Sequence, residues 1–402
     1  MMDTAHTFPK SLRLMTIVII SALLCLSIAL AAQNSALKLN TQITNKEIDQ
    51  FGYFIVDALS KGDAQSFNKA VNKDALINSA LEGISLESKT VKGLREGLSK
   101  GLDQVGETTI NSLGEKARLT YVRGRFLNQT PYALIRVDFG AKGLNYLDYI
   151  LEKDREGTVR IIDWYDYSQG QLYSHSVRQA LVLLVPKDKG IILRLLGKDS
   201  IDDKAVKHFI ELSKLGKEQK YQEWLTKYAQ LPDKLKYSRT LLISRVFIAN
   251  YSGDEKQYRM ALADLNRHFG TDPTLSLLLV DHYLLEGDYP AAHTALNNLK
   301  NHTGGDAAID GMQANVYLTE KNYPESLKYA KLAVKQDPDY ENAYWTLIDS
   351  SIRVKEYKTA VKAIEELEKN FGYTFDPKEL AKIEGYDAFA KSPVFAQWKS
   401  NR

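Results

Sequence analysis

The sequence contains little that would support disulfide, thiol or zinc chemistry. Its 402 residues include a single cysteine, which excludes an internal disulfide and a zinc site built from several cysteines. The charges nearly balance, with 53 Lys and Arg against 50 Asp and Glu, so the strongly basic footprint of a nucleic-acid-binding protein is missing. Hydrophobic residues make up 44% of the chain, which is ordinary for a globular protein and excludes an acidic disordered tail. We expect a folded protein of two or three domains.

The short motifs of common catalytic and cofactor sites are also missing. The sequence has no Walker loop, no H-E-x-x-H motif and no EF-hand loop, and no two histidines are three or four residues apart. Residues 97–101 spell G-x-S-x-G, but this nucleophile motif needs a preceding strand, and Leu94, Leu98 and Leu102 form a helical stripe through it. The glycines of this stretch are four residues apart, which indicates close packing against another helix. We therefore predict a protein that is not an enzyme, with no catalytic residue, metal or cofactor.

A long uncharged run lies near the N-terminus, from Leu14 to Ala32. Lys10 and Arg13 precede it, and a basic flank before an apolar segment directs the following chain out of the cytosol. As a helix, this run would span ~28 Å, about the hydrocarbon thickness of a bilayer. Residues 1–32 are therefore predicted to be either a cleaved signal peptide or an N-terminal membrane anchor. Either way, the body of the protein is predicted to be exported, to the periplasm or another extracytoplasmic space.

A repeat of 34 residues occupies the C-terminal part of the chain. The segments 272–305, 306–339 and 340–373 align without gaps, and each has the pattern of a helix, a short turn and a second helix. A tyrosine and, three residues later, a small residue recur in the second helix: Tyr289, Tyr323 and Tyr357, with Ala292, Ser326 and Ala360. Such a period predicts a solenoid of stacked helix pairs.

Residues 272–373 resemble tetratricopeptide repeats. The resemblance rests on the small or aliphatic residue of each first helix, on the recurring tyrosines and on the small residue of each second helix. It implies a concave groove that binds a protein partner and is lined mainly by the first helices. By position, the resemblance places six candidates in or beside this groove: Leu277, Asp281, Asn315, Trp345, Asp349 and Arg353.

Two of these candidates bear on the kind of partner. Trp345 with Arg353 beside it has the composition of an interface hot spot, and its alternative role is packing against the neighbouring repeat. The carboxylate-clamp subfamily has Lys and Asn at the early groove positions, where Leu277 and Asp281 stand here. The resemblance therefore does not imply recognition of a C-terminal carboxylate.

Helices are also expected on both sides of the three repeats. Residues 171–203 are predicted to be connecting helices, and residues 204–271 have the pattern of two degenerate tetratricopeptide-like helix pairs. Residues 374–402 are predicted to be capping helices, since the end of a solenoid needs a cover. Asp376 is the expected N-cap of the first of them, with Pro377 as its first helical residue.

The pattern of apolar residues differs in residues 45–170, which follow a linker at 33–44. It is helical up to about residue 110 and alternates from about Ala117. Four expected strands with three short turns predict an antiparallel meander, and helices followed by a meander give an α+β domain. We therefore expect an α+β domain followed by an all-α solenoid. The element order resembles the cone-shaped fold of ketosteroid-isomerase-like and nuclear-transport-factor-like domains, and that resemblance implies a fold that could hold a pocket.

A pocket in the α+β domain would combine carboxylates with aromatic walls. The candidate residues are Asp138, Asp163 and Tyr165. A carboxylate in an apolar cavity can have its pKa shifted toward neutrality and act as a general base. The alternative interpretation is a half-solvated sheet with cross-strand Arg–Asp pairs and amphipathic tyrosines.

These observations leave three functional hypotheses. The first is an exported or membrane-anchored scaffold of the cell envelope whose repeats hold a protein partner. The second is a small-ligand-binding or enzymatic α+β domain with the repeats as an accessory. The third, a membrane-assembly subunit, requires that residues 14–32 remain in the mature protein. No nucleic-acid partner is expected, and the membrane is expected to be contacted only through residues 14–32 if they are not cleaved.

Overall fold

The computed structural model describes residues 42–83, 88–114, 117–140, 143–182, 192–193 and 203–401. The predicted signal or anchor segment, residues 14–32, lies outside these ranges. Within the described ranges, no helix is both long and apolar enough to cross a membrane. Export and membrane anchoring therefore stay predictions.

The first part of the chain folds as a layer of helices. These are α2 (Asn45–Ser60), α3 (Ala64–Ala70), α4 (Lys73–Leu81), α5 (Ser88–Leu102) and α6 (Val105–Leu113). Helix α2 begins at a capping box, in which Thr44 and Glu47 each accept a hydrogen bond from the other's backbone N–H. Its apolar residues recur every three or four positions, so that Ile48, Ile55 and Leu59 share the buried face.

The G-x-S-x-G sequence at residues 97–101 lies inside helix α5. The motif is therefore not the strand-to-helix turn of a hydrolase nucleophile, as the helical stripe predicts. The expectation of close packing at the glycines is wrong. A Cβ atom at Gly93, Gly97 or Gly101 would meet no described atom within 4 Å.

The described residues contain a single antiparallel sheet with the strand order β1-β2-β3-β4-β5. Its strands are β1 (Arg118–Leu127), β2 (Thr130–Asp138), β3 (Leu144–Lys153), β4 (Val159–Asp166) and β5 (Gln171–Leu172). Asn128 and Gln129 join β1 to β2, and both have positive φ values, 49° and 68°. The topology of the predicted antiparallel meander is confirmed. The sheet has a fifth strand in addition to the four predicted, because β5 has only two residues and is too short to show an alternating pattern.

The two faces of the sheet pack against different helices. One face shares a core with the N-terminal helices and includes Ile135, Val137, Tyr149 and Ile161. The other face contributes Leu134, Tyr146 and Tyr167 to a core with the repeat helices. The sheet is therefore the middle layer of three, and the expectation of a half-solvated sheet is wrong. The resemblance to the cone-shaped fold stays a prediction.

The repeats fold as helix pairs at the predicted positions. The three pairs are α14 (Ser276–Glu286) with α15 (Tyr289–Thr303), α16 (Ala307–Thr319) with α17 (Tyr323–Gln336), and α18 (Glu341–Arg353) with α19 (Tyr357–Phe371). A short 3-10 turn, η2 (Pro273–Leu275), precedes α14. Each second helix starts at the recurring tyrosine, so the 34-residue period is a structural repeat.

Further helices extend this array in both directions. Before the repeats lie α7 (Tyr173–Val182), α9 (Asp203–Lys217), α10 (Tyr221–Ala229), α11 (Asp233–Lys236), α12 (Arg239–Ser252) and α13 (Glu255–Phe269). After them lie α20 (Pro377–Leu380), α21 (Asp387–Ala390) and α22 (Pro393–Ser400). The short helix α11, which Pro232 caps, interrupts the register of the earlier pairs. Asp376 caps α20 and Pro377 is its first residue, as predicted.

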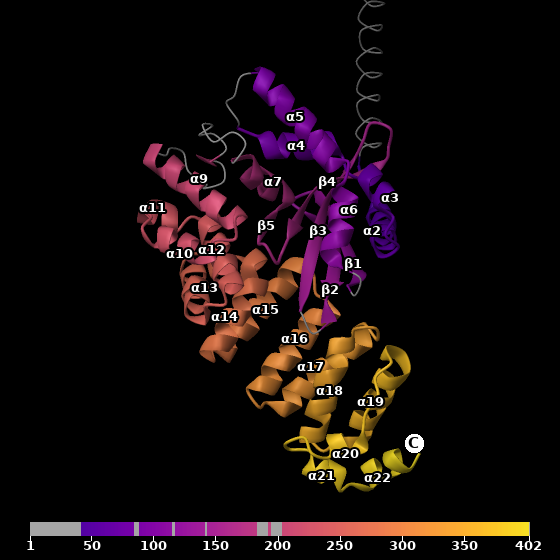
Figure 1. Ribbon diagram of the computed structural model, residues 1–402. Coiled ribbons are helices and arrows are strands. Elements are labelled where there is room, and N and C mark those ends of the chain that lie inside the picture. Colours follow the sequence, from indigo (N-terminus) through magenta and orange to yellow (C-terminus); the bar gives the residue numbers. More distant parts are fainter. Residues whose placement is uncertain are drawn as a thin grey trace, which may run out of the picture.

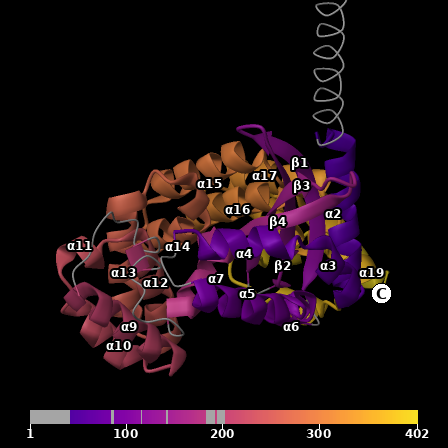
Figure 2. The same ribbon diagram turned by 90° about the horizontal axis from the view of Figure 1, so that it is seen from above.

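The helical array curves past the sheet (Figure 1). Seen from above, the sheet lies between the helices α15 to α17 on one side and α2 to α6 on the other (Figure 2). The structure thus has the predicted order, an α+β part followed by a helical array. The close docking of the array onto one face of the sheet is an additional feature, which the sequence does not indicate.

Arg136, on strand β2, joins the sheet to the repeats. Its side chain is 1% exposed and donates to both carboxylate oxygens of Asp306, at 2.8 and 3.0 Å, and also to Asp337. Its guanidinium lies over the ring of Tyr340, 4.8 Å from the centroid, and Tyr146 donates to Asp306 at 2.7 Å. Burial alone would lower the pKa of Arg136, but Asp306 and Asp337 outweigh it and raise the pKa. Asp306 and Tyr340 are the first residues of the second and third repeats, so one arginine holds two junctions of the array.

Strand β1 supplies two further arginines to these junctions. Arg123 donates to the carbonyl of Gly305 at 2.9 Å, and Arg118 donates to the carbonyl of Asp339. Gly304 and Gly305 have φ values of +84° and +92°, a conformation that favours glycine. A Cβ atom at Gly304 would also lie 2.7 Å from Nη1 of Arg123. The turn between the first two repeats is therefore shaped to fit against the sheet.

Replacing Arg136 with methionine should lower the free energy of unfolding in urea by about 3–5 kcal/mol, because the buried carboxylate of Asp306 and the half-buried one of Asp337 would lose their counter-charge. The matched control is Lys61→Met. Lys61 pairs with Asp57, but their side chains are 70% and 61% exposed, and the expected change is within about 0.5 kcal/mol. Equal effects of the two substitutions would show that the buried ion pair does not hold the fold together.

Candidate functional site: a groove between the first repeat helices and the sheet

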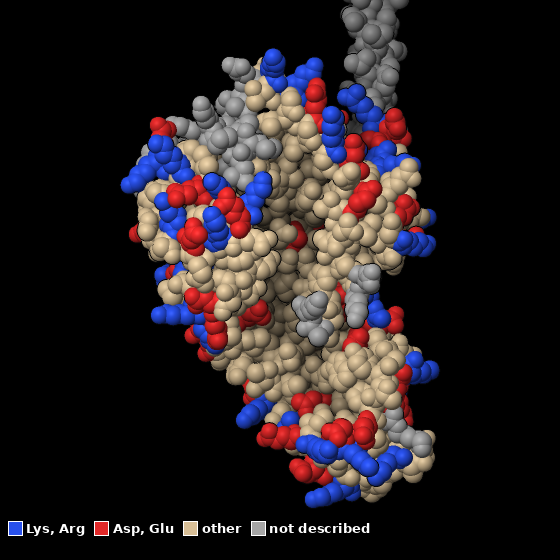
Figure 3. Space-filling view, viewed as in Figure 1, with Lys and Arg blue, Asp and Glu red and all other residues tan. Residues whose placement is uncertain are grey.

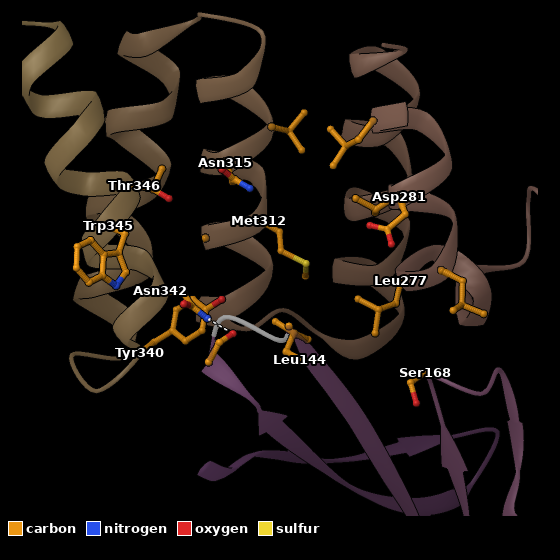
Figure 4. Close-up of a pocket in the computed structure, with 17 residues that line it drawn as sticks. Leu144, Ser168, Leu277, Asp281, Met312, Asn315, Tyr340, Asn342, Trp345 and Thr346 are labelled. Carbon is orange, nitrogen blue, oxygen red and sulfur yellow. Dashed lines mark hydrogen bonds between the residues drawn. The ribbon is translucent and has the colours of Figure 1, made fainter. Parts of the chain in front are cut away.

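The first helices of the three repeats, α14, α16 and α18, lie side by side and form one wall of a cavity of about 580 Å³ (Figure 4). Residues of the sheet and its loops form the floor, namely Gly140, Gly143, Leu144 and Ser168. In the space-filling view the molecule is hollowed between the helical array and the sheet, and the walls of this hollow are mostly uncharged (Figure 3). We call this cavity the groove.

Helical spacing brings the wall residues to one side. Leu277, Asp281 and Leu284 are three or four positions apart on α14, and Gly311 and Asn315 are four apart on α16, so each set shares a helix face. The 34-residue period then aligns these faces from repeat to repeat. The groove is therefore a property of the repeat and not of a single helix.

Four of the six predicted groove residues line the cavity: Leu277, Asp281, Asn315 and Trp345. The structure does not bring Asp349 and Arg353 to it. Arg353 donates to Asp349 at 3.2 Å and to the carbonyl of Glu384 at 3.3 Å, and Tyr386 donates to Asp349. These two residues hold the C-terminal cap, and the predicted pair of Trp345 with Arg353 does not form in the groove.

A second set of groove residues was not predicted, although the 34-residue period relates its members to one another. Leu278, Met312 and Thr346 are 34 residues apart and all line the cavity. Leu278 and Thr346 directly follow Leu277 and Trp345, which are among the predicted groove residues. The sequence does not indicate which residues form the floor of the groove, because the floor depends on how the sheet packs against the array.

Trp345 lies at one end of the groove within an aromatic cluster that we define as Trp345, Tyr373 and Phe375. The centroid of the Trp345 ring is 4.9 Å from that of Tyr373 and 5.6 Å from that of Phe375. Nε1 of Trp345 donates to Glu341 at 3.4 Å, and Tyr373 donates to the same carboxylate. Trp345 and Tyr373 are each 38% exposed. Trp345 therefore packs against its neighbours and still presents apolar surface to the solvent.

Asp281 is the one acidic or basic side chain among the described residues that line the groove. It is exposed, and the surrounding walls partly desolvate it, which raises the pKa of its carboxyl group. The hydroxyl of Tyr258 donates to it at 3.4 Å. The carboxylate thus faces an apolar groove.

The protein's own chain separates this groove from a second cavity. Ser168 lines both the groove and a cavity of about 620 Å³ between α7, α9 and α12. Gly170, in the same turn between β4 and β5, is packed so tightly that a Cβ atom there would lie 2.6 Å from Leu275 and 3.2 Å from Ile243. This turn therefore limits the length of the groove.

The three candidates for a pocket in the α+β domain are held by different partners. Asp138 accepts from the backbone N–H of Gly140 at 2.8 Å. Asp163 accepts from the backbone N–H groups of Trp164 and Ser174 at 2.9 and 3.1 Å, and Tyr165 donates to Thr274 at 2.9 Å. Burial raises the pKa of both carboxyl groups. The structure does not bring the three together as one site.

No group of three or more His, Cys, Asp or Glu side chains in the described ranges is arranged to hold a metal ion.

Comparisons with known proteins found no matching family model and no matching curated protein. Among solved structures, MamA 41-end from Desulfovibrio magneticus RS-1 and the MamA RS-1 ArsTM double mutant are each 15% identical to this chain. Each match covers 42% of this chain and 96% of the other, with a TM-score of 0.36. A likeness at this TM-score carries no inference about function.

The exposure of Trp345 can be measured directly. Trp345 is 38% exposed, whereas Trp164, Trp224 and Trp398 are 5%, 3% and 4% exposed. Acrylamide should therefore quench one accessible fraction of the tryptophan fluorescence, and Trp345→Phe should remove that fraction. Trp224→Phe is the control and should leave it in place. An accessible fraction that survives Trp345→Phe would contradict the described geometry of the groove.

Proposed function

We propose that this protein is a non-enzymatic scaffold whose groove holds a segment of a protein partner. The observation that carries the proposal is the cavity formed by α14, α16 and α18, with apolar walls and a partly exposed tryptophan at one end. Exposed aromatic side chains beside an apolar depression are typical of interaction hot spots. The helix pairs also support repeats of the tetratricopeptide type, whose first helices bind partners.

The size of the groove favours a peptide segment over a folded domain. A volume of about 580 Å³ accommodates a few side chains but not a folded domain. Amphipathic helices and extended segments are recognised in apolar grooves through a small number of anchor residues. We infer that the partner inserts a few apolar side chains between the first helices and the sheet.

We further propose that the scaffold acts outside the cytosol, secreted or held by an N-terminal anchor. Support for this comes from the sequence, in which Lys10 and Arg13 precede the apolar run of residues 14–32. The alternative of a ligand-binding or enzymatic α+β domain has less support, because Asp138, Asp163 and Tyr165 each bind separate structural partners.

Site-specific photo-crosslinking tests the scaffold function. Met312 lines the groove, whereas Met260 on α13 is 45% exposed and is not among the groove residues. Met312→p-benzoylphenylalanine in living cells should give a discrete protein adduct, and adding Trp345→Ala should weaken it at least several-fold. Met260→p-benzoylphenylalanine is the matched control and should not give that adduct. The absence of an adduct at 312, or the same adducts from both positions, would contradict the proposal.

A further inference from the structure

Many aspartates of the array are paired with a basic side chain, and Asp281 differs from them in its partners. Six others lie within 3.2 Å of a basic side chain: Asp264 of Arg245, Asp272 of Arg239, Asp306 and Asp337 of Arg136, Asp310 of Lys300 and Asp349 of Arg353. In the described part of the chain, Asp281 has no ion pair, and the hydroxyl of Tyr258 donates to it at 3.4 Å. The array thus neutralises these carboxylates and leaves Asp281 available at the groove.

The surroundings of Asp281 are apolar. Leu277, Leu278 and Leu284 flank it on α14, and Met312 on α16 faces it across the groove (Figure 4). A carboxylate among such residues is partly desolvated, and this raises its pKa. A partner that filled the groove with apolar groups alone would desolvate the carboxylate further, which is costly unless the charge is paired.

We propose, on the basis of the scaffold function above, that the segment bound in the groove is apolar and carries one basic side chain that pairs with Asp281. Its apolar side chains contact the leucines of α14 and Met312. Its arginine or lysine donates to the Asp281 carboxylate, and arginine can do so through two parallel hydrogen bonds. A segment that presents an acidic side chain at this place is excluded, because two carboxylates would then face each other in an apolar groove.

Selection from a phage-displayed library of random 12-residue peptides tests this inference. The library is panned against the detergent-solubilised full chain, and peptides are kept if Trp345→Ala weakens their binding. Wild-type protein should enrich peptides with one Lys or Arg among apolar residues. Asp281→Lys should instead enrich an acidic residue at that place. Asp281→Asn, which keeps the shape of the side chain, should bind the wild-type peptides roughly 10- to 100-fold more weakly.

Asp233→Lys is the matched control, because Asp233 is 80% exposed, lies on α11 and is not among the groove residues. It should leave the selected sequences unchanged. Two results would overturn the inference and leave the scaffold function standing. The first is enrichment of peptides that lack a basic residue although Trp345→Ala weakens their binding. The second is that Asp281→Lys selects the same basic peptides as the wild type. A failure to enrich any groove-dependent peptide would count against the scaffold function itself, and the inference would fall with it.

Discussion

The arrangement of this protein depends on the buried charge of Arg136. An arginine that is 1% exposed is unfavourable unless its charge is compensated, and the compensation here comes from Asp306, Asp337 and the ring of Tyr340. All three lie at junctions between repeats, whereas Arg136 belongs to the sheet. Without the other part, the buried charges of Arg136 in the sheet and Asp306 in the array would stay unpaired. The sheet and the repeats are therefore one structural unit, although their sequences look like two unrelated domains.

This docking determines what kind of groove the repeats can form. A free solenoid offers an open concave face along its whole length. Here the sheet provides a floor through Leu144 and Ser168, and the tightly packed turn at Gly170 separates the groove from the cavity beyond it. The result is a short groove closed on one side, with the aromatic cluster at one end and Asp281 in its wall. Its shape suits a few anchoring side chains of a partner.

Much of the fold could be predicted because it follows from local periodicity. The 34-residue spacing of Tyr289, Tyr323 and Tyr357 places the helix pairs, and the alternation after Ala117 places the strands. The groove could be predicted in part, since Leu277, Asp281, Asn315 and Trp345 line it. The same period placed Asp349 there wrongly, because the cap engages that residue. The ion pair of Arg136 with Asp306 joins residues 170 positions apart, and the floor of the groove also joins segments that are distant in the sequence. No local pattern indicates such contacts.

The central claim is that the sheet, through Arg136, holds the junctions of the array and thereby shapes the groove. Hydrogen–deuterium exchange of wild type and Arg136→Met, followed by mass spectrometry, tests this claim most directly. The account predicts faster exchange at the junctions, residues 304–310 and 337–343, with the cap helices α20 to α22 unchanged. Unchanged exchange at both junctions, or an equal increase throughout the array, would contradict it.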